Sequence, residues 1–291
     1  MAERTRAYLD PKKDRILHES VGYRSRMFRS FPSRGYRQVA AERCYPPAVK
    51  LYEPLNVLKP VGEDLWVIDG PLVRMAYFGG SIPFPTRMVV VRLQSGDLFL
   101  WSPTEPDNRL LSQVDILGPV KHLVSPNKIH YAHIGTWKQA YPKAVAWASP
   151  RVRERAASRG VVTFEAELGD EPDPVWREDL DQLIFRGSRF MEEVVFFHRK
   201  TRTLILADLL ENFETEKVGS ASGWLVRLAG AADPDGKAPI DLRLTFLGRK
   251  SQARASFERM LAWEPEKVIM AHGRWYERDG TKELRRAFRW L

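Results

Sequence analysis

Cysteine is almost missing from this sequence of 291 residues, because Cys44 is the only one. A lone cysteine cannot form an intramolecular disulfide, which argues against a disulfide-stabilised secreted domain. No stretch approaches the roughly 18 consecutive apolar residues of a membrane-spanning helix, and residues 1–15 lack the apolar core of a secretory signal. These absences predict a protein without a membrane span in a reducing compartment, and we expect the cytoplasm.

Positive charge is concentrated at the N-terminus. Residues 1–50 carry 12 Lys and Arg against 5 Asp and Glu, whereas the whole chain has a net charge of +9. The breaker Pro46-Pro47 ends this segment, which predicts a basic arm over 1–50 and a folded domain over 51–291. Such an arm can bind nucleic acid, but it is more often solvated, so nucleic acid is not an expected partner. An organelle transit peptide within residues 24–43 is the weaker alternative, because acidic residues precede this segment.

The hydrophobic pattern of the domain predicts an α/β fold. Strand-like runs at 64–70, 86–93 and 97–102 open a β-meander with a hairpin turn at 94–96, and loops are expected at 71–86 and 212–240. Strand and helix patterns then alternate, which implies parallel pairing with crossovers. We therefore expect two mixed sheets with helices packed outside them. The later strands are expected at 120–126, 144–149, 181–185, 192–200, 202–210 and 267–273, and the helices at 110–118, 134–142, 151–160, 251–263 and 281–291.

Several common catalytic motifs are absent. The sequence has no glycine-rich phosphate loop, no Gly-x-Ser-x-Gly elbow and no Cys-x-x-Cys pair, so nothing supports a serine or cysteine nucleophile. Four other side chains follow predicted strands: His130 and His133 three residues apart, Asp208 after an apolar run, and His272 before a glycine. A carboxylate at the edge of a core needs a partner or a metal. Imidazole and carboxylate together suit Zn, Mn or Fe.

Each of these four residues also has an ordinary structural interpretation. His130 and His133 could cap a helix or form a surface pair, Asp208 could cap a following helix, and His272 could be a buried histidine with satisfied hydrogen bonds. Their common position at strand ends, where α/β sheets collect ligands, favours a shared site. His122 and His198 lie within strand-like runs and are expected to be structural.

Four blocks of sequence resemble the family called domain of unknown function 4336, which is similar in turn to the metallo-β-lactamase superfamily. They are TRMVVVRLQSGDLFLWSP (86–103), GPVKHLVSPNKIHYAHIGTWKQAYPKA (118–144), EEVVFFHRKTRTLILADLLENF (192–213) and IMAHG (269–273). The resemblance covers about 51–291. It implies an αββα sandwich with metal ligands in loops at one edge of the sheets.

The superfamily's His-x-His-x-Asp-His motif matches residues 128–133, where His130 and His133 are retained but Lys128 and Ala132 replace a histidine and the aspartate. The bridging aspartate of the superfamily resembles Asp208 and its last histidine resembles His272. An intermediate histidine has no counterpart in 185–191, and Ser102 stands where an early aspartate is expected. The resemblance therefore implies one metal, most readily Zn, with Fe or Mn as alternatives, rather than two. Lys128 could instead fill an empty site and bind Asp208 directly.

Three functional hypotheses follow. The first is a metal-dependent hydrolase, in which His130, His133, Asp208 and His272 hold the ion and its acidified water supplies a hydroxide nucleophile. In this hypothesis Asp208 and Lys128 are the catalytic residues, with Lys128 orienting a small anionic substrate. The second is a metal-free binding protein that keeps only the fold. The third is redox or oxygen chemistry at a metal such as iron. The sequence does not indicate an oligomeric state.

Overall fold

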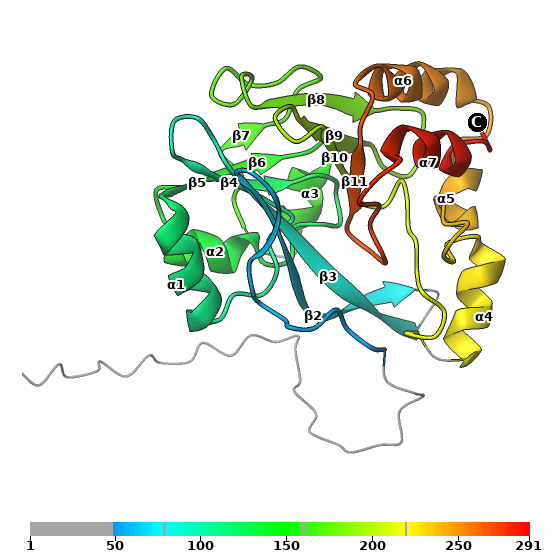
Figure 1. The fold of residues 1–291 in the computed structure, drawn as a ribbon, viewed down its shortest axis with the longest axis horizontal. Coiled ribbons are helices and arrows are strands. Elements are labelled where there is room, and N and C mark those ends of the chain that lie inside the picture. Colours follow the sequence, from blue (N-terminus) through cyan, green and yellow to red (C-terminus); the bar gives the residue numbers. More distant parts are fainter. Residues whose placement is uncertain (1–48, 78–79, 159, 161, 219) are drawn as a thin grey trace, which may run out of the picture. The chain divides into compact units, whose positions relative to one another are not determined.

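The computed structural model describes residues 49–77, 80–158, 160, 162–218 and 220–291, so the predicted basic arm lies outside the described residues except for its last two residues, 49 and 50. Two β-sheets pack face to face, with helices on their outer faces (Figure 1). The predicted class, an α/β fold of two mixed sheets covered by helices, is confirmed. Within the described ranges, no helix is long and apolar enough to cross a membrane.

The larger sheet contains seven strands in sequence order, from β1 to β7. Strands β1 to β4 pair antiparallel, and β4 to β7 pair parallel. The Gly96 turn joins β3 to β4 as predicted, with the Gly96 N–H donating to the Leu93 carbonyl at 2.8 Å. The strands are β1 Lys59–Gly62, β2 Leu65–Tyr77, β3 Gly80–Arg92, β4 Leu98–Trp101, β5 Val120–Ser125, β6 Val145–Ala148 and β7 Ala166–Glu167.

The smaller sheet has the order β11-β10-β9-β8. Strand β11, at one edge of this sheet, pairs parallel with β10, and the other two strand pairs are antiparallel. These strands are nearly continuous apolar runs because both faces are covered. They are β8 Leu180–Phe185, β9 Glu193–His198, β10 Thr203–Leu206 and β11 Lys267–Met270.

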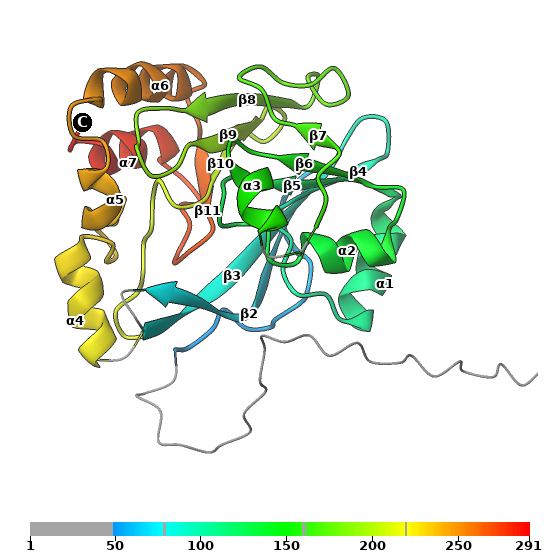
Figure 2. The ribbon, with the colours of Figure 1, turned by 180° about the vertical axis from the view of Figure 1, so that it is seen from behind.

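The helices form the two outer layers, which Figure 2 shows from behind. On the seven-stranded sheet lie α1 Asn108–Leu117, α2 Ile134–Ala140 and α3 Val152–Ala157, which share a buried cluster with its strands. Next to the four-stranded sheet lie α5 Ile240–Leu244, α6 Lys250–Ala262 and α7 Gly280–Ala287. Helix α4, Ser220–Ala229, precedes α5 and lies within the segment expected to be a loop at 212–240.

A third apolar cluster fills the space between the sheets. It joins Phe99 and Trp101 of β4 to Phe196 of β9 and Ile269 of β11, all fully buried. The Phe99 and Phe196 rings meet edge to face at 5.2 Å between centroids. This core fixes the two sheets against each other, so loops from both sheets reach the same edge of the sandwich.

The segment expected to be a loop at 71–86 belongs mostly to a long β2–β3 hairpin. Pro71, Pro83 and Pro85 favoured the loop interpretation, because proline cannot donate to a strand ladder. The pairing of β4 with β3 reaches only from Val89 to Arg92. The half of β3 that contains the prolines therefore pairs with β2 alone, and the missing N–H groups leave no gap in a second ladder.

Candidate metal centre

Three side chains that are far apart in the sequence meet at one edge of the sandwich. Asp208 and His272 each come two residues after paired parallel strands, whose final residues Leu206 and Met270 are in register. His130 comes from the loop after β5 in the other sheet. The candidate ligand atoms of His130, Asp208 and His272 all lie within 4.8 Å of one another. The strand register therefore explains why the sequence brings Asp208 and His272 together.

Both histidines present Nε2 to the Asp208 carboxylate, at 3.3 Å from Oδ2 for His130 and 3.3 Å from Oδ1 for His272. Their Nδ1 atoms have other partners: His272 Nδ1 donates to the Pro85 carbonyl at 2.9 Å, and His130 Nδ1 is hydrogen-bonded to Ser102 Oγ at 2.8 Å. Such outer hydrogen bonds fix the tautomer of a metal-binding imidazole. A tetrahedral ion with bonds of about 2.0–2.1 Å separates its ligands by about 3.3–3.4 Å. The donor set therefore fits one divalent metal.

Electrostatics hold the carboxylate in its charged form. Burial by itself raises the pKa of Asp208, but His130 and His272 outweigh it and hold the pKa well below its usual range. Burial opposes charge on His130 as well, yet Asp208 and Glu193 raise its pKa. A carboxylate must be deprotonated to bind a metal ion, and Asp208 meets this condition.

Two buried polar residues that the sequence analysis did not select support Asp208. The Asn127 side-chain amide donates to Asp208 Oδ2 at 2.7 Å and to Glu193 Oε2 at 3.0 Å. The Glu193 carboxylate accepts the backbone N–H groups of Ala207 and Asp208 at 2.7 and 2.9 Å. Burial, and then the charge of Asp208, raise the pKa of Glu193. Glu193 could have been noticed in the sequence, because it is an acidic residue at the start of the apolar run that forms β9.

A buried arginine ties the loop that carries His272 to the opposite sheet. Arg87 of β3 is 3% exposed and donates through Nη1 to the carbonyls of Met270 and Gly273, at 2.8 Å each. Its other nitrogens contact the Asp69 carboxylate at 2.7 and 2.9 Å. Together with the bond from His272 to Pro85, β3 therefore holds His272 from both sides.

Gly273 allows the close approach that places His272. Its φ is +89°, and a Cβ there would lie 2.2 Å from the Asn212 carbonyl oxygen. The Asn212 N–H donates to the His272 carbonyl at 3.3 Å, and the Arg274 N–H donates to the Asn212 carbonyl at 2.8 Å. A side chain at position 273 would displace this bridge, so glycine is required by both space and conformation.

The other two predicted site residues lie apart from this group. His133 begins α2 without a side-chain capping bond, its Nε2 is buried with no hydrogen-bond partner, and burial lowers its pKa. Lys128 Nζ donates to the Phe190 carbonyl and lies 3.7 Å from the centroid of the Phe190 ring. The lysine therefore does not fill the space between the histidines and Asp208.

Ser102, at the position where the resemblance leads one to expect an aspartate, reaches the site. It follows β4 with φ of +48°, an uncommon conformation for a residue with a side chain, and it is 8% exposed. Its Oγ orients His130 instead of a carboxylate. His122 and His198 lie elsewhere, within β5 and β9, and contact Trp147 and Thr201 respectively.

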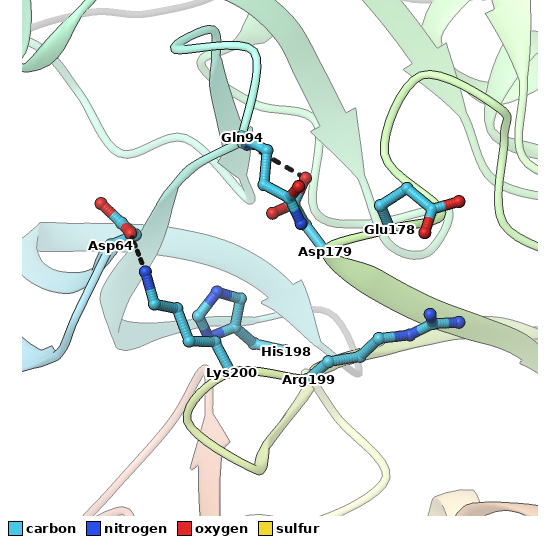
Figure 3. Close-up of a pocket in the computed structure, with 7 residues that line it drawn as sticks. All are labelled: Asp64, Gln94, Glu178, Asp179, His198, Arg199 and Lys200. Atoms are coloured by element: carbon cyan, nitrogen blue, oxygen red, sulfur yellow. Dashed lines mark hydrogen bonds and ion pairs between the residues drawn. The ribbon is translucent and has the colours of Figure 1, made fainter.

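A separate hollow of about 400 Å³ lies at the opposite edge of the sheets, where β3 and β9 end. Figure 3 shows the ion pair between Lys200 and Asp64 beside His198, and the bond from the Gln94 N–H to Asp179. Arg199, also at its edge, pairs with Asp181. Because the hollow lies at the opposite edge of the sheets, it is separate from the candidate metal centre.

Comparison with known proteins agrees with the sequence resemblance. Residues 79–222 match the family described as Domain of unknown function (DUF4336). A search of curated proteins gives no significant match.

Several solved structures of metallo-β-lactamases are similar to the chain. DIM-1, in a crystal exposed to ceftazidime, is 16% identical with a TM-score of 0.53, over 82% of this chain and 96% of that chain. The enzyme from Hirschia baltica is 15% identical with a TM-score of 0.52, over 81% and 96%. FIM-1 from Pseudomonas aeruginosa, in its mono-zinc form, is 14% identical with a TM-score of 0.52, over 82% and 95%. At such identities the likeness concerns the fold, and it confirms the predicted αββα sandwich.

The match covers strand β3 of the long hairpin, the loop of His130 and the strand that leads to Asp208, and the structural likeness extends over most of the chain. This chain therefore carries a DUF4336 domain and has the fold of the metallo-β-lactamases.

Proposed function

We propose that this protein is a metal-dependent hydrolase with a single divalent cation held by His130, Asp208 and His272. The observation that carries the proposal is the orientation of the two imidazoles, whose Nε2 atoms face the Asp208 carboxylate while their Nδ1 atoms are bonded elsewhere. Three protein ligands with an open position are typical of catalytic zinc sites. The mono-zinc form of FIM-1 supports a single ion on this scaffold.

The bound cation would supply Lewis acidity, which lowers the pKa of water toward neutrality and polarises a substrate oxygen. The protein's own residues hold this site in shape. Asn127 and the two backbone N–H groups bound by Glu193 fix Asp208, whereas Ser102 and Pro85 fix the two rings. Hydrolysis of a carboxylic or phosphoric ester is the reaction class that we favour by analogy of fold.

Metal analysis of the full-length protein, purified without chelator, tests the proposal. We expect close to one equivalent of Zn, Fe or Mn in the wild-type protein and its loss in His130→Ala and in Asp208→Ala. His133→Ala is the matched control, because His133 lies outside the three-residue group, and it should keep the metal. A folded wild-type protein that takes up none of the three metals after reconstitution would leave a metal-free binding protein as the better interpretation.

A specific observation favours a second candidate, a metal-free serine hydrolase. Ser102 Oγ contacts His130 Nδ1 at 2.8 Å, and His130 Nε2 lies 3.3 Å from Asp208, so a serine, a histidine and an aspartate form a continuous chain. Ser102→Ala separates the candidates. In the metal-dependent case this variant keeps its metal and part of its esterase activity. Loss of all activity, together with labelling of wild-type Ser102 by a fluorophosphonate, would favour the serine mechanism.

A further inference from the structure

Three cationic side chains follow β5 and β6, at the edge of the seven-stranded sheet that carries His130. Lys128 lies in the loop after β5, two residues before His130, and Arg151 and Arg155 belong to the segment after β6. Strands β5 and β6 are parallel neighbours paired from His122 to Ser125. Their C-terminal loops are therefore adjacent, at the edge of the sheet from which His130 reaches Asp208.

Lys128 is held in place without a carboxylate partner. Its ammonium group donates to the Phe190 carbonyl and lies 3.7 Å from the centroid of the Phe190 ring, which is 43% exposed. A cation over an aromatic face keeps its positive charge available to a further partner. Lys128 is therefore a fixed cation next to an accessible apolar ring.

Arg151 directly precedes α3, in a left-handed conformation with φ of +65°, and Arg155 lies within this helix. Val152 and Ala156 of the helix are buried against the outer face of the sheet. Arg155 Nε is buried without a hydrogen-bond partner. Ser125 at the end of β5 pairs with Ala148 at the end of β6, and Lys128 and Arg151 each follow these residues by three positions, so the strand register brings them to the same edge of the sheet.

None of these three cations pairs with a carboxylate among the residues that the structure describes. Arg153, on the same helix, provides the contrast, because its Nε lies 2.8 Å from Glu167 Oε1. Glu167 of β7 thus neutralises Arg153, whereas Arg151 and Arg155 have no such partner. Concentrated positive charge without a protein counter-ion is the arrangement that recognises an anion.

We propose that Lys128, Arg151 and Arg155 bind the oxyanion group, a carboxylate or a phosphate, of the substrate hydrolysed at the metal centre. The inference rests on the proposed function and adds the substrate class. Guanidinium groups match both oxyanions through paired N–H donors. The Phe190 ring offers contact to an apolar part of the same molecule.

Calorimetric titration of the full-length protein with inorganic phosphate, and separately with malonate, tests the inference. We expect each of Lys128→Ala, Arg151→Ala and Arg155→Ala to weaken binding roughly tenfold, as the loss of one charge-assisted hydrogen bond implies. Arg153→Ala removes an arginine of the same helix that is already paired, and it should change binding by less than about twofold. A stronger effect for malonate than for phosphate, or the reverse, identifies the preferred oxyanion.

The same titration in His130→Ala separates this inference from the proposed function. If the cationic cluster binds the anion, binding persists in this metal-deficient variant and remains sensitive to Arg155→Ala. If His130→Ala abolishes binding while the three cationic variants leave it intact, the anion binds the metal itself. That result would overturn the inference but not the metal centre. Anion binding by a protein that takes up no metal would support the cluster and overturn the proposed function.

Discussion

Arg87 provides the most direct link between a single side chain and the geometry of the candidate centre. Its guanidinium joins Asp69 of one sheet to the carbonyls of Met270 and Gly273 on either side of His272. We expect Arg87→Ala to lower the free energy of unfolding by roughly 3–5 kcal/mol, because it leaves the buried Asp69 carboxylate with Lys59 alone and removes the donor to two carbonyls. Urea denaturation measures this loss.

A measurement of zinc affinity shows whether Arg87 positions the metal ligands in addition to stabilising the fold. Competition with a chromogenic zinc chelator should give a weaker affinity for Arg87→Ala, by roughly 10- to 100-fold, as for other residues that orient ligands. Phe288→Ala, described below, is the control for a destabilised protein with an intact site. An unchanged zinc affinity in Arg87→Ala would mean that the hydrogen bond from His272 to the Pro85 carbonyl is sufficient to position His272.

His198 predicts a pH-dependent stability. It is 1% exposed, and burial lowers its pKa from 6.5 to about 4. The unfolded chain takes up a proton near pH 6.5, whereas the folded protein resists protonation until about pH 4. Stability is therefore complete above pH 6.5 and falls as the pH drops toward 4, by roughly 3 kcal/mol from this group.

The variant His198→Gln tests this contribution, because glutamine does not titrate. The difference in unfolding free energy between wild type and variant should shift by roughly 3 kcal/mol between pH 7 and pH 4, in favour of the variant at low pH. Denaturation curves at several pH values measure the shift. A difference that stays constant with pH would show that His198 is protonated equally easily in both states.

At the scale of elements, Phe288 is the largest of the buried side chains that attach α7 to the four-stranded sheet, together with Leu284 and Ala287. Phe288, at the end of this helix, is 2% exposed, and its ring lies 5.5 Å from that of Phe185 in β8 and 5.0 Å from that of Phe257 in α6. We expect Phe288→Ala to destabilise the protein by roughly 3–5 kcal/mol through loss of buried area and creation of a cavity. Thermal denaturation measures this cost, while the metal content of the folded fraction should stay at the wild-type level. Loss of metal from folded Phe288→Ala would show that α7 also shapes the centre.

At the scale of the whole molecule, the metal should act as a link between the sheets. His130 comes from the seven-stranded sheet, and Asp208 and His272 come from the four-stranded sheet. Zinc at about 100 times its dissociation constant should stabilise the folded state by roughly 2.7 kcal/mol. For a domain of this size the melting temperature then rises by roughly 5–10 °C. Differential scanning fluorimetry with and without chelator measures this shift, and the same zinc addition should leave His130→Ala unchanged.

The local patterns of the sequence predicted most of the fold. The strand pattern of residues 120–126 corresponds to β5 (Val120–Ser125), and the helical spacing of residues 251–263 corresponds to α6 (Lys250–Ala262). Both depend on a repeat of apolar residues within a few positions, which a sequence displays directly. The outer part of the β2–β3 hairpin, at 71–86, was missed because its prolines are tolerated only where one side of a strand is unpaired, and pairing is not a local property.

The site was partly predictable for a related reason. His130, Asp208 and His272 could be selected because each follows a strand, and parallel strands place their ends at one edge. His133 satisfied the same rule, but it stands at the start of α2 outside the group of three. The direction in which the His133 ring points is set by side chains from other segments, and a local pattern does not show them.

The amino-acid sequence thus determined the order of the elements, the αββα class and the family, because these depend on local periodicity and on motifs read along the chain. The tertiary structure alone decided which polar side chains share a site. Asn127 contacts Asp208 across 81 positions of sequence, and Arg87 contacts the carbonyls of Met270 and Gly273, on either side of His272, across 183 and 186 positions. Glu193 accepts the Asp208 N–H across 15 positions. Such contacts arise only when two sheets pack face to face and bring distant loops to one edge, and no local pattern encodes that distance.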